Sequence, residues 1–315
     1  MPRYPQAILV SCELPWDEHE ELMEDIFRRE IRHVSRSFRH LYVFGTAGEG
    51  YAVDTRRFRH IVTVFYEETL GISAPKDMHP MVGVIGQSTA NVIERLQFAH
   101  DVGFRVFQIS LPAWGALNNE ELLRFFTDVC GAFPDSQFLH YNLPRAGRVL
   151  TGMDYARLLE VVPNLVATKN TSRDLAKVAD LLRHAPDLQH FLSEAGFAHG
   201  CQLGECSILS ALGPTTPHKV WELFDAGCLG QLEKVVRLRD GFHQLLHGVL
   251  DPLLVKQRID GAYDKVMKRL GGFEEMPLRL LSPYQGFSEV EYQACRDRFY
   301  EQFPDWTPES VGKYS

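Results

Sequence analysis

The sequence predicts an α/β fold, a (β/α)8 barrel with a C-terminal helical extension. Short apolar runs typical of buried strands alternate about eight times with segments of helical periodicity, and the connections between them are short. Such alternation is typical of a parallel sheet with helices outside it. Eight strand–helix units in roughly 230 residues fit a closed barrel, which typically takes about 250, better than an open sheet. We therefore expect the barrel to occupy residues 1–227 and the extension to occupy residues 228–315.

Eight strands are expected from the apolar runs. Each run is short and is bounded by turn-forming residues, as where the run ending at Asn142 meets Leu143 and Pro144. The expected strands cover residues 7–12, 40–44, 80–84, 104–111, 137–142, 165–168, 190–193 and 206–209.

The helices are expected from apolar spacing and from their end signals. Asp17, with Glu20 three residues later, resembles a capping box and predicts that the first helix begins there. In the extension, apolar periodicity predicts helices over residues 231–246, 255–270 and 288–303.

Charge and composition exclude several classes of protein. The 315 residues include 33 Lys and Arg against 41 Asp and Glu, a formal net charge of −8, which argues against nucleic acid as the main partner. The N-terminal apolar run is too short for a signal peptide and no stretch is long enough to span a bilayer, so we expect a cytoplasmic protein without membrane contact. The six cysteines are scattered without a CxxC pattern and indicate reduced thiols.

No cofactor and no metal are expected. His199, Cys201 and Cys206 are metal-ligating residue types close together in the sequence, but their spacing matches no common zinc pattern.

Two polar residues end neighbouring strands of the predicted barrel. Tyr141 lies near the end of the strand over residues 137–142, and Lys169 directly follows the strand over residues 165–168. The carboxyl ends of barrel strands form the face where the chemistry of this fold is located, so the two side chains should share a pocket. Apolar surroundings would lower the pKa of the lysine and make its amine a nucleophile for a ketone. The phenol beside it could move protons.

The glycine-rich turn at residues 45–50 follows the second strand. It lacks the lysine of a P-loop and does not match a dinucleotide fingerprint, so nucleotide binding is not expected. Its backbone N–H groups at the start of a helix would suit a substrate carboxylate.

Three motifs in order resemble the dihydrodipicolinate synthase / N-acetylneuraminate lyase family of class I aldolases. Residues Gly45–Glu49 look like the family's G-[ST]-T-G-E turn, Tyr141–Pro144 like its Y-N-x-P motif, and Lys169–Asp174 like its K-x-T-S-G-D segment. Tyr141 and Lys169 also stand at the family's usual spacing, and the resemblance covers nearly the whole chain.

The resemblance implies a (β/α)8 barrel that assembles as a homotetramer and acts on a small 2-oxo acid, usually pyruvate. It implies that Lys169 forms an iminium with this substrate and that Tyr141 transfers protons. Thr46 would belong to the proton relay, and the backbone of Thr46 and Ala47 would hold the substrate carboxylate.

Departures from the family pattern bear on the substrate. Ala47 replaces a threonine and so lacks one carboxylate-binding hydroxyl, and Arg173 stands where glycine is common. Trp114 lies where the lysine-biosynthesis enzymes have the second tyrosine of the relay, so condensation with aspartate semialdehyde is not expected. A tryptophan here resembles the hydratase-aldolases of aromatic substrates, and it would shape a pocket for a bulkier partner. Arg145 could bind a second acidic group.

Three functions remain open at this point. The sequence favours a Schiff-base carbon–carbon lyase, either an aldolase or a hydratase-aldolase. A dehydratase of 2-oxo-3-deoxy sugar acids would use the same lysine and tyrosine. A non-catalytic relic that only binds a 2-oxo acid would keep the barrel, although it would not need to retain both Lys169 and Tyr141.

Overall fold

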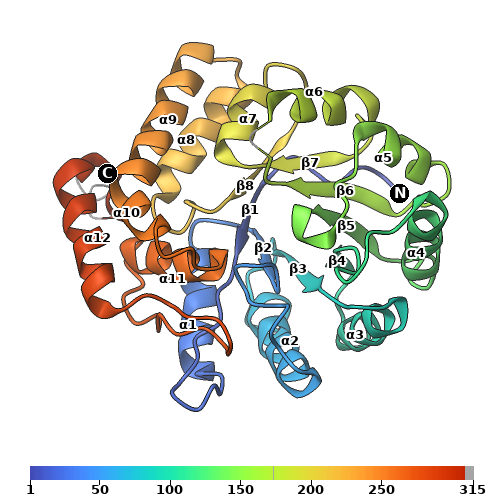
Figure 1. Cartoon of the computed structure of the whole chain (residues 1–315), viewed down its shortest axis with the longest axis horizontal. Coiled ribbons are helices and arrows are strands. Elements are labelled where there is room, and N and C mark those ends of the chain that lie inside the picture. Colours follow the sequence, from blue (N-terminus) through green and yellow to red (C-terminus); the bar gives the residue numbers. More distant parts are fainter. Residues whose placement is uncertain (173, 309–315) are drawn as a thin grey trace.

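The computed structural model describes residues 1–172 and 174–308 as a closed eight-stranded barrel surrounded by helices (Figure 1). Each strand pairs in parallel with the next, and β8 closes the ring on β1. The predicted fold class is therefore confirmed. Arg173, one of the departures named above, lies outside the described residues. The strands are β1 (Ile8–Ser11), β2 (His40–Val43), β3 (His79–Val84), β4 (Val106–Ile109), β5 (Gln137–Asn142), β6 (Leu165–Asn170), β7 (Gln189–Leu192) and β8 (Ser207–Ser210).

Eight helices follow the strands and lie outside the ring (Figure 1). Apolar side chains of the helices and of the outer strand faces form the larger core, and the barrel interior holds a second cluster that includes Leu9, Met81, Leu139 and Phe191. The helices are α1 (Glu24–Ser35), α2 (Thr55–Thr69), α3 (Thr89–Val102), α4 (Asn119–Gly131), α5 (Gly152–Leu159), α6 (Leu175–His184), α7 (Glu194–Gly200) and α8 (Pro217–Cys228).

The predicted start of the first helix at Asp17 is wrong. The Asp17 carboxylate accepts hydrogen bonds from the backbone N–H groups of His19 and Glu21 at 2.8 and 2.9 Å, which closes a turn. The helix begins only at Glu24. Short polar side chains serve turns and helix caps by the same hydrogen bonds, so the sequence pattern did not separate the two.

The extension after α8 is helical, and in Figure 1 it gathers on one side of the barrel. The predicted helix over residues 255–270 begins five residues late, because Gln257 has a φ of +50°, which interrupts a right-handed helix. Asp260 therefore opens the helix that approaches the barrel. The elements are α9 (Leu232–Leu245), the π-helix η2 (Leu246–Leu250), α10 (Asp251–Leu254), α11 (Asp260–Leu270) and α12 (Glu289–Gln302), with single 3-10 turns η1 (Pro144–Ala146) and η3 (Pro304–Trp306).

Two buried lysines fix α11 to the barrel. Lys268 lies 2.6 Å from carboxylate oxygens of both Glu13 and Glu30. Lys265 lies 2.8 Å from Glu49. All five side chains are almost completely excluded from solvent, so losing one partner would leave an uncompensated buried charge. These contacts hold α11 at the carboxyl-terminal mouth of the barrel.

The strand register brings two pairs of polar residues together at this mouth. Tyr141 on β5 is aligned with Lys169 on β6, and Ser11 on β1 is aligned with Tyr42 on β2. Aligned residues of neighbouring parallel strands present their side chains to the same face of the sheet. The four side chains all line one cavity.

Candidate active site

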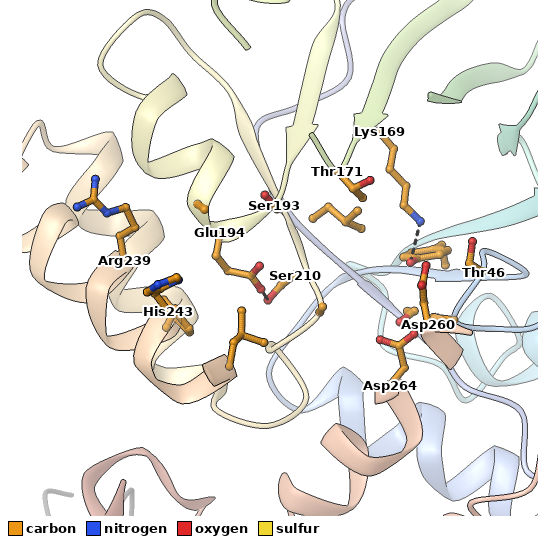
Figure 2. A pocket seen from close by; sticks show the side chains of 18 of the residues that line it. Thr46, Lys169, Thr171, Ser193, Glu194, Ser210, Arg239, His243, Asp260 and Asp264 are labelled. Carbon is orange, nitrogen blue, oxygen red and sulfur yellow. Dashed lines mark hydrogen bonds between the residues drawn. The ribbon is translucent and has the colours of Figure 1, made fainter. Parts of the chain in front are cut away.

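A cavity of about 650 Å³ opens at the carboxyl ends of the strands (Figure 2). This volume is in the range of small-molecule sites. Strand residues form its floor, the turn after β2 and helix α11 form one side, and α7 and α9 form the opposite side. Its lining includes Ser11, Tyr42, Thr46, Ala47, Tyr141, Lys169, Thr171, Ser193, Glu194, Ser210, His243, Asp260 and Asp264.

Lys169 lies at the centre of this floor with only 2% of its surface exposed. Its Nζ donates a hydrogen bond of 2.9 Å to the hydroxyl of Tyr42 and lies 3.9 Å from the ring centroid of Tyr141. Burial lowers the pKa of Lys169 to about 7, although the carboxylates of Asp260 and Asp264 act in the opposite direction. A large fraction of this amine is therefore unprotonated near neutral pH, as a nucleophile requires.

Tyr141 and Thr46 form a second hydroxyl pair beside the lysine. Their oxygens are 3.3 Å apart, and both side chains are about 95% buried. Burial raises the pKa of Tyr141, while the hydrogen bond from Thr46 acts to lower it. The phenol is thus protonated at neutral pH and is placed to exchange a proton with a group bound on Lys169.

The turn after β2 comes very close to the lysine. A Cβ atom at Gly45 would lie 2.5 Å from the Tyr42 ring and 3.2 Å from Lys169 Nζ, so only glycine fits. Phe44 and Glu49 have positive φ values of 65° and 49°, which non-glycine residues rarely adopt. Such strain is characteristic of segments held in place for a function.

Ala47 lines the cavity at the position where the sequence suggested a missing hydroxyl. Helix α11 packs on this turn, since a Cβ atom at Gly261 would lie 3.3 Å from the Ala47 carbonyl oxygen and 3.4 Å from that of Thr46. The turn and the first residues of α11 therefore form one continuous wall.

Helix α11 contributes two carboxyl groups to this wall, Asp260 and Asp264 (Figure 2). Burial raises the pKa of Asp264 well above its usual value, and repulsion from Glu13 and Asp260 acts in the same direction. Burial therefore favours the neutral form of the Asp264 carboxyl group.

The opposite side of the cavity is rich in hydroxyl groups. Thr171, Ser193 and Ser210 line it together with the carboxylate of Glu194, which accepts a 2.7 Å hydrogen bond from Ser210. His243 on α9 closes this end (Figure 2). These groups can orient a hydroxylated or otherwise polar tail of a bound molecule.

Two of the predicted site residues lie outside the cavity of this chain. Arg145 forms a bidentate ion pair with Asp260 at 2.9 and 3.0 Å. Its positive charge is therefore already paired with a carboxylate of the cavity wall. Trp114, on the loop between β4 and α4, is 95% exposed and is not among the described residues that line the cavity. Of the sequence-predicted site, the structure brings together Lys169, Tyr141, Thr46 and Ala47.

Several residues that line the cavity were not predicted from the sequence. Tyr42 looked like an interior strand residue, and only its position three residues before the glycine turn could have suggested more. Asp260 and Asp264 lie about ninety residues after Lys169 in the sequence, in a segment that carries no recognisable catalytic motif. Their i, i+4 spacing on a helix face was visible, but the docking of that face was not.

No metal site emerges from the part of the chain that the structure describes. Within residues 1–172 and 174–308, no three His, Cys, Asp or Glu side chains gather as a metal ion would require.

Comparison with known proteins agrees with this geometry. Residues 5–276 match the Dihydrodipicolinate synthetase family. The chain belongs to this family. The resemblance seen in three short motifs is thereby confirmed over nearly the whole barrel and much of the extension.

Individual members of the family are distant relatives. A 4-hydroxy-tetrahydrodipicolinate synthase of Laribacter hongkongensis is 24% identical over 266 residues, which cover 82% of this chain and 87% of that protein. An N-acetylneuraminate lyase of Salmonella paratyphi B is 24% identical over 189 residues, covering 60% and 62%. A prophage protein of the family from E. coli K12, solved in complex with pyruvate, superposes with a TM-score of 0.79 at 16% identity, covering 94% of this chain and 98% of that one.

Family membership makes the chain a lyase of the aldolase type. Its relatives carry at least two different names, so membership fixes the kind of enzyme without fixing the substrate. Among the described helices, none combines the length and apolar character needed to cross a membrane.

Proposed function

We propose that the protein is a Schiff-base carbon–carbon lyase that acts on pyruvate or another 2-oxo acid through Lys169. The observation that carries this proposal is a buried lysine with a pKa near 7, at the floor of a 650 Å³ cavity, between two phenols. No carboxylate of the described residues lies within ion-pair distance of its Nζ, so the amine is free to react with a ketone. The prophage relative solved with pyruvate supports this substrate class.

The chemistry follows from these groups. The unprotonated amine of Lys169 adds to the 2-oxo carbon, and loss of water from the adduct leaves an iminium. When the bond beyond the neighbouring carbon breaks, its electron pair moves into the iminium and forms an enamine. Tyr141 gives its phenol proton to the hydroxide that leaves as water during iminium formation, and the resulting phenolate accepts the proton of the hydroxyl that becomes the aldehyde. Tyr141 then returns this proton to the enamine carbon and regains a proton from the water that hydrolyses the iminium. Hydrolysis of the iminium then releases the 2-oxo acid and restores Lys169.

The turn at residues 45–50 is proposed to hold the substrate carboxylate. Thr46 keeps the Tyr141 hydroxyl in place at 3.3 Å, and the backbone N–H groups of Thr46 and Ala47 bind the carboxylate. Because Ala47 has no hydroxyl, this anchor has one donor fewer than a threonine would give it.

A dehydratase of 2-oxo-3-deoxy sugar acids is the second candidate. It is favoured by the hydroxyl-rich wall of Thr171, Ser193 and Ser210 with the Glu194 carboxylate, which suits a polyhydroxylated tail. The same iminium on Lys169 would lose a proton from the neighbouring deoxy carbon to form an enamine, and the enamine would expel the hydroxide of the following carbon instead of breaking a carbon–carbon bond.

The identity of the second substrate rests on Trp114 and Arg145. Trp114 cannot supply the hydroxyl of a tyrosine relay, so we propose that aspartate semialdehyde is not the partner.

We further propose a homotetramer in which Trp114 of a neighbouring copy reaches this cavity, because the 95% exposed indole does not reach it within one chain. Arg145 would meet a second acidic group only by exchanging Asp260 for it.

The test is borohydride reduction of the purified protein with a panel of 2-oxo acids, read by intact mass, followed by product analysis. An adduct that adds the mass of reduced pyruvate, together with release of an aldehyde from aldol substrates, is expected. Release of water without carbon–carbon cleavage would select the dehydratase. A protein that forms no adduct with any member of the panel would be the non-catalytic relic.

A further inference from the structure

Lys169 must lose a proton before it can attack a ketone, and a chain of buried hydroxyl groups leads away from it. Lys169 Nζ donates to the Tyr42 hydroxyl at 2.9 Å, and Ser11, aligned with Tyr42 on the neighbouring strand, lines the same cavity. The Ser11 hydroxyl in turn donates to Glu13 Oε1 at 2.5 Å. The alignment of Ser11 with Tyr42 on adjacent strands places both side chains on the same face of the sheet.

We propose that Tyr42, Ser11 and Glu13 form a proton relay that removes the proton of the Lys169 ammonium group during imine formation. This inference rests on the Schiff-base function proposed above. Tyr42 is the catalytic residue of the relay, because it touches the reacting nitrogen, and Ser11 and Glu13 act through it. Tyr141 and Thr46 belong to a separate hydroxyl pair, which serves the substrate in the proposed function.

The transfer balances in one concerted shift. Lys169 Nζ gives a proton to the Tyr42 oxygen, Tyr42 gives its own proton to Ser11, and Ser11 gives its own to Glu13 Oε1. The ammonium becomes an amine and the Glu13 carboxylate becomes a carboxylic acid. No co-reactant is needed, and the reverse shift restores the ammonium when the product leaves.

The relay ends in a buried cluster of charged groups. Glu13, Glu30 and Lys268 form a buried cluster in which Lys268 contacts both carboxylates at 2.6 Å. Two carboxylates and one ammonium carry a net negative charge, and Glu30 Oε2 has no hydrogen-bond partner among the described residues. An unpartnered buried carboxylate oxygen is costly, and a proton lowers that cost. Burial also raises the pKa of Glu30 to about 7, close to that of Lys169.

Other titratable groups face the relay and set its pH range. Those near Lys169 come from β5 and α11, and those near Glu13 come from α1, α11 and the residue after β1. They are Tyr141, Asp260, Asp264, Lys265, Lys268, Glu30 and Cys12.

The test measures the rate of imine formation with pyruvate, by borohydride quenching and intact mass, between pH 6 and pH 9. At pH 6 most Lys169 amines hold a proton and need the relay. Tyr42→Phe and Ser11→Ala should each slow the reaction by about 10²-fold at pH 6, the lower end for general acid–base groups. At pH 9 the amine is already neutral, and both variants should come within about threefold of the wild type.

A double variant separates a relay from independent packing effects. If the two residues belong to one chain, Tyr42→Phe with Ser11→Ala should be no slower at pH 6 than either single variant. The matched control is Tyr4→Phe, which also removes a buried phenol hydroxyl inside the barrel, one bonded to His40 at 2.8 Å, and should match the wild type at both pH values.

Two results would overturn the relay while leaving the Schiff base intact. One is wild-type rates in both single variants at pH 6. The other is equal slowing at pH 6 and pH 9, which would mean that these residues only pack. If the wild type itself forms no adduct with pyruvate or any other 2-oxo acid, the proposed function fails and the relay fails with it.

Discussion

Lys169 on β6 and Lys268 on α11 are both buried at the mouth of the barrel, but their surroundings give them opposite chemistry. Lys268 contacts two carboxylates at 2.6 Å, and these raise its pKa although burial alone would lower it. Lys169 donates to a neutral phenol, and burial lowers its pKa to about 7. Burial therefore lowers the pKa of a lysine here only where close carboxylates do not outweigh it.

Lys265 lies between these two cases. It is paired with Glu49 at 2.8 Å, yet burial still lowers its pKa. Glu49 is shared, because it also accepts hydrogen bonds from the indole of Trp16 and the backbone N–H of Leu281. Lys265 and Lys268 hold α11 against the barrel, and only Lys169 faces the cavity.

The largest expected effect comes from replacing each of the two lysines with methionine. Lys169→Met should abolish imine formation and turnover while the protein remains folded, because the reacting nitrogen is gone. Lys268→Met should instead cost about 3–5 kcal/mol of stability, because it leaves two buried carboxylates without a cation. Circular dichroism melts and intact-mass trapping on both variants check this. Similar melting losses in the two variants would contradict the comparison.

The second prediction concerns the phenol on the substrate side. Tyr141→Phe should reduce turnover by about 10²–10⁴-fold, because the proton carrier is lost while the ring remains packed. Tyr155→Phe is the matched control: it removes a buried hydroxyl bonded to His140 at 2.7 Å on the outer side of β5. Steady-state rates measure both. Near wild-type turnover in Tyr141→Phe would exclude the proton-transfer role.

The third prediction is a pH dependence of stability. A lysine with a pKa of about 7 in the folded state and 10.5 in the unfolded state binds more protons when unfolded between these values, so it favours folding increasingly as pH rises. From pH 7 to pH 9 the wild type should gain about 2 kcal/mol relative to Lys169→Met. Lys268 adds no such increase of stability with pH, because its pKa in the folded state is raised. Urea unfolding of both proteins at pH 7, 8 and 9 tests this, and parallel profiles would refute it.

The smallest expected effect belongs to the exposed indole. If Trp114 from a neighbouring copy stacks on the substrate, Trp114→Ala should lower kcat/KM for aromatic aldehydes relative to aliphatic ones by about 2- to 12-fold, the equivalent of about 0.5–1.5 kcal/mol. Light scattering on both proteins gives the assembly. Unchanged aldehyde preference would leave Trp114 as a packing residue, and a monomeric wild type would exclude the contact.

The sequence predicted those parts of the site that depend on local pattern. Tyr141 and Lys169 end consecutive strands, and consecutive strands of a barrel are neighbours, so their contact followed from chain order. The glycine turn was equally local, and its close approach to the lysine at Gly45 explains why glycine is needed there.

What the sequence did not predict depends on tertiary docking. The pairing of Lys268 with Glu13 and Glu30 joins residues more than two hundred positions apart, and no local signal encodes it. The start of α11 was also missed, because Gln257 takes a left-handed conformation that residue type does not announce. Asp260 and Asp264 therefore entered the site only with the structure.

The most direct test of this account is the position of the covalent adduct. The purified protein is reduced with borohydride in the presence of pyruvate, digested and mapped by tandem mass spectrometry. We predict one modified lysine, Lys169, with Lys265 and Lys268 unmodified because their amines are paired with buried carboxylates. An adduct on another lysine, or unchanged labelling of the Lys169→Met protein, would contradict it.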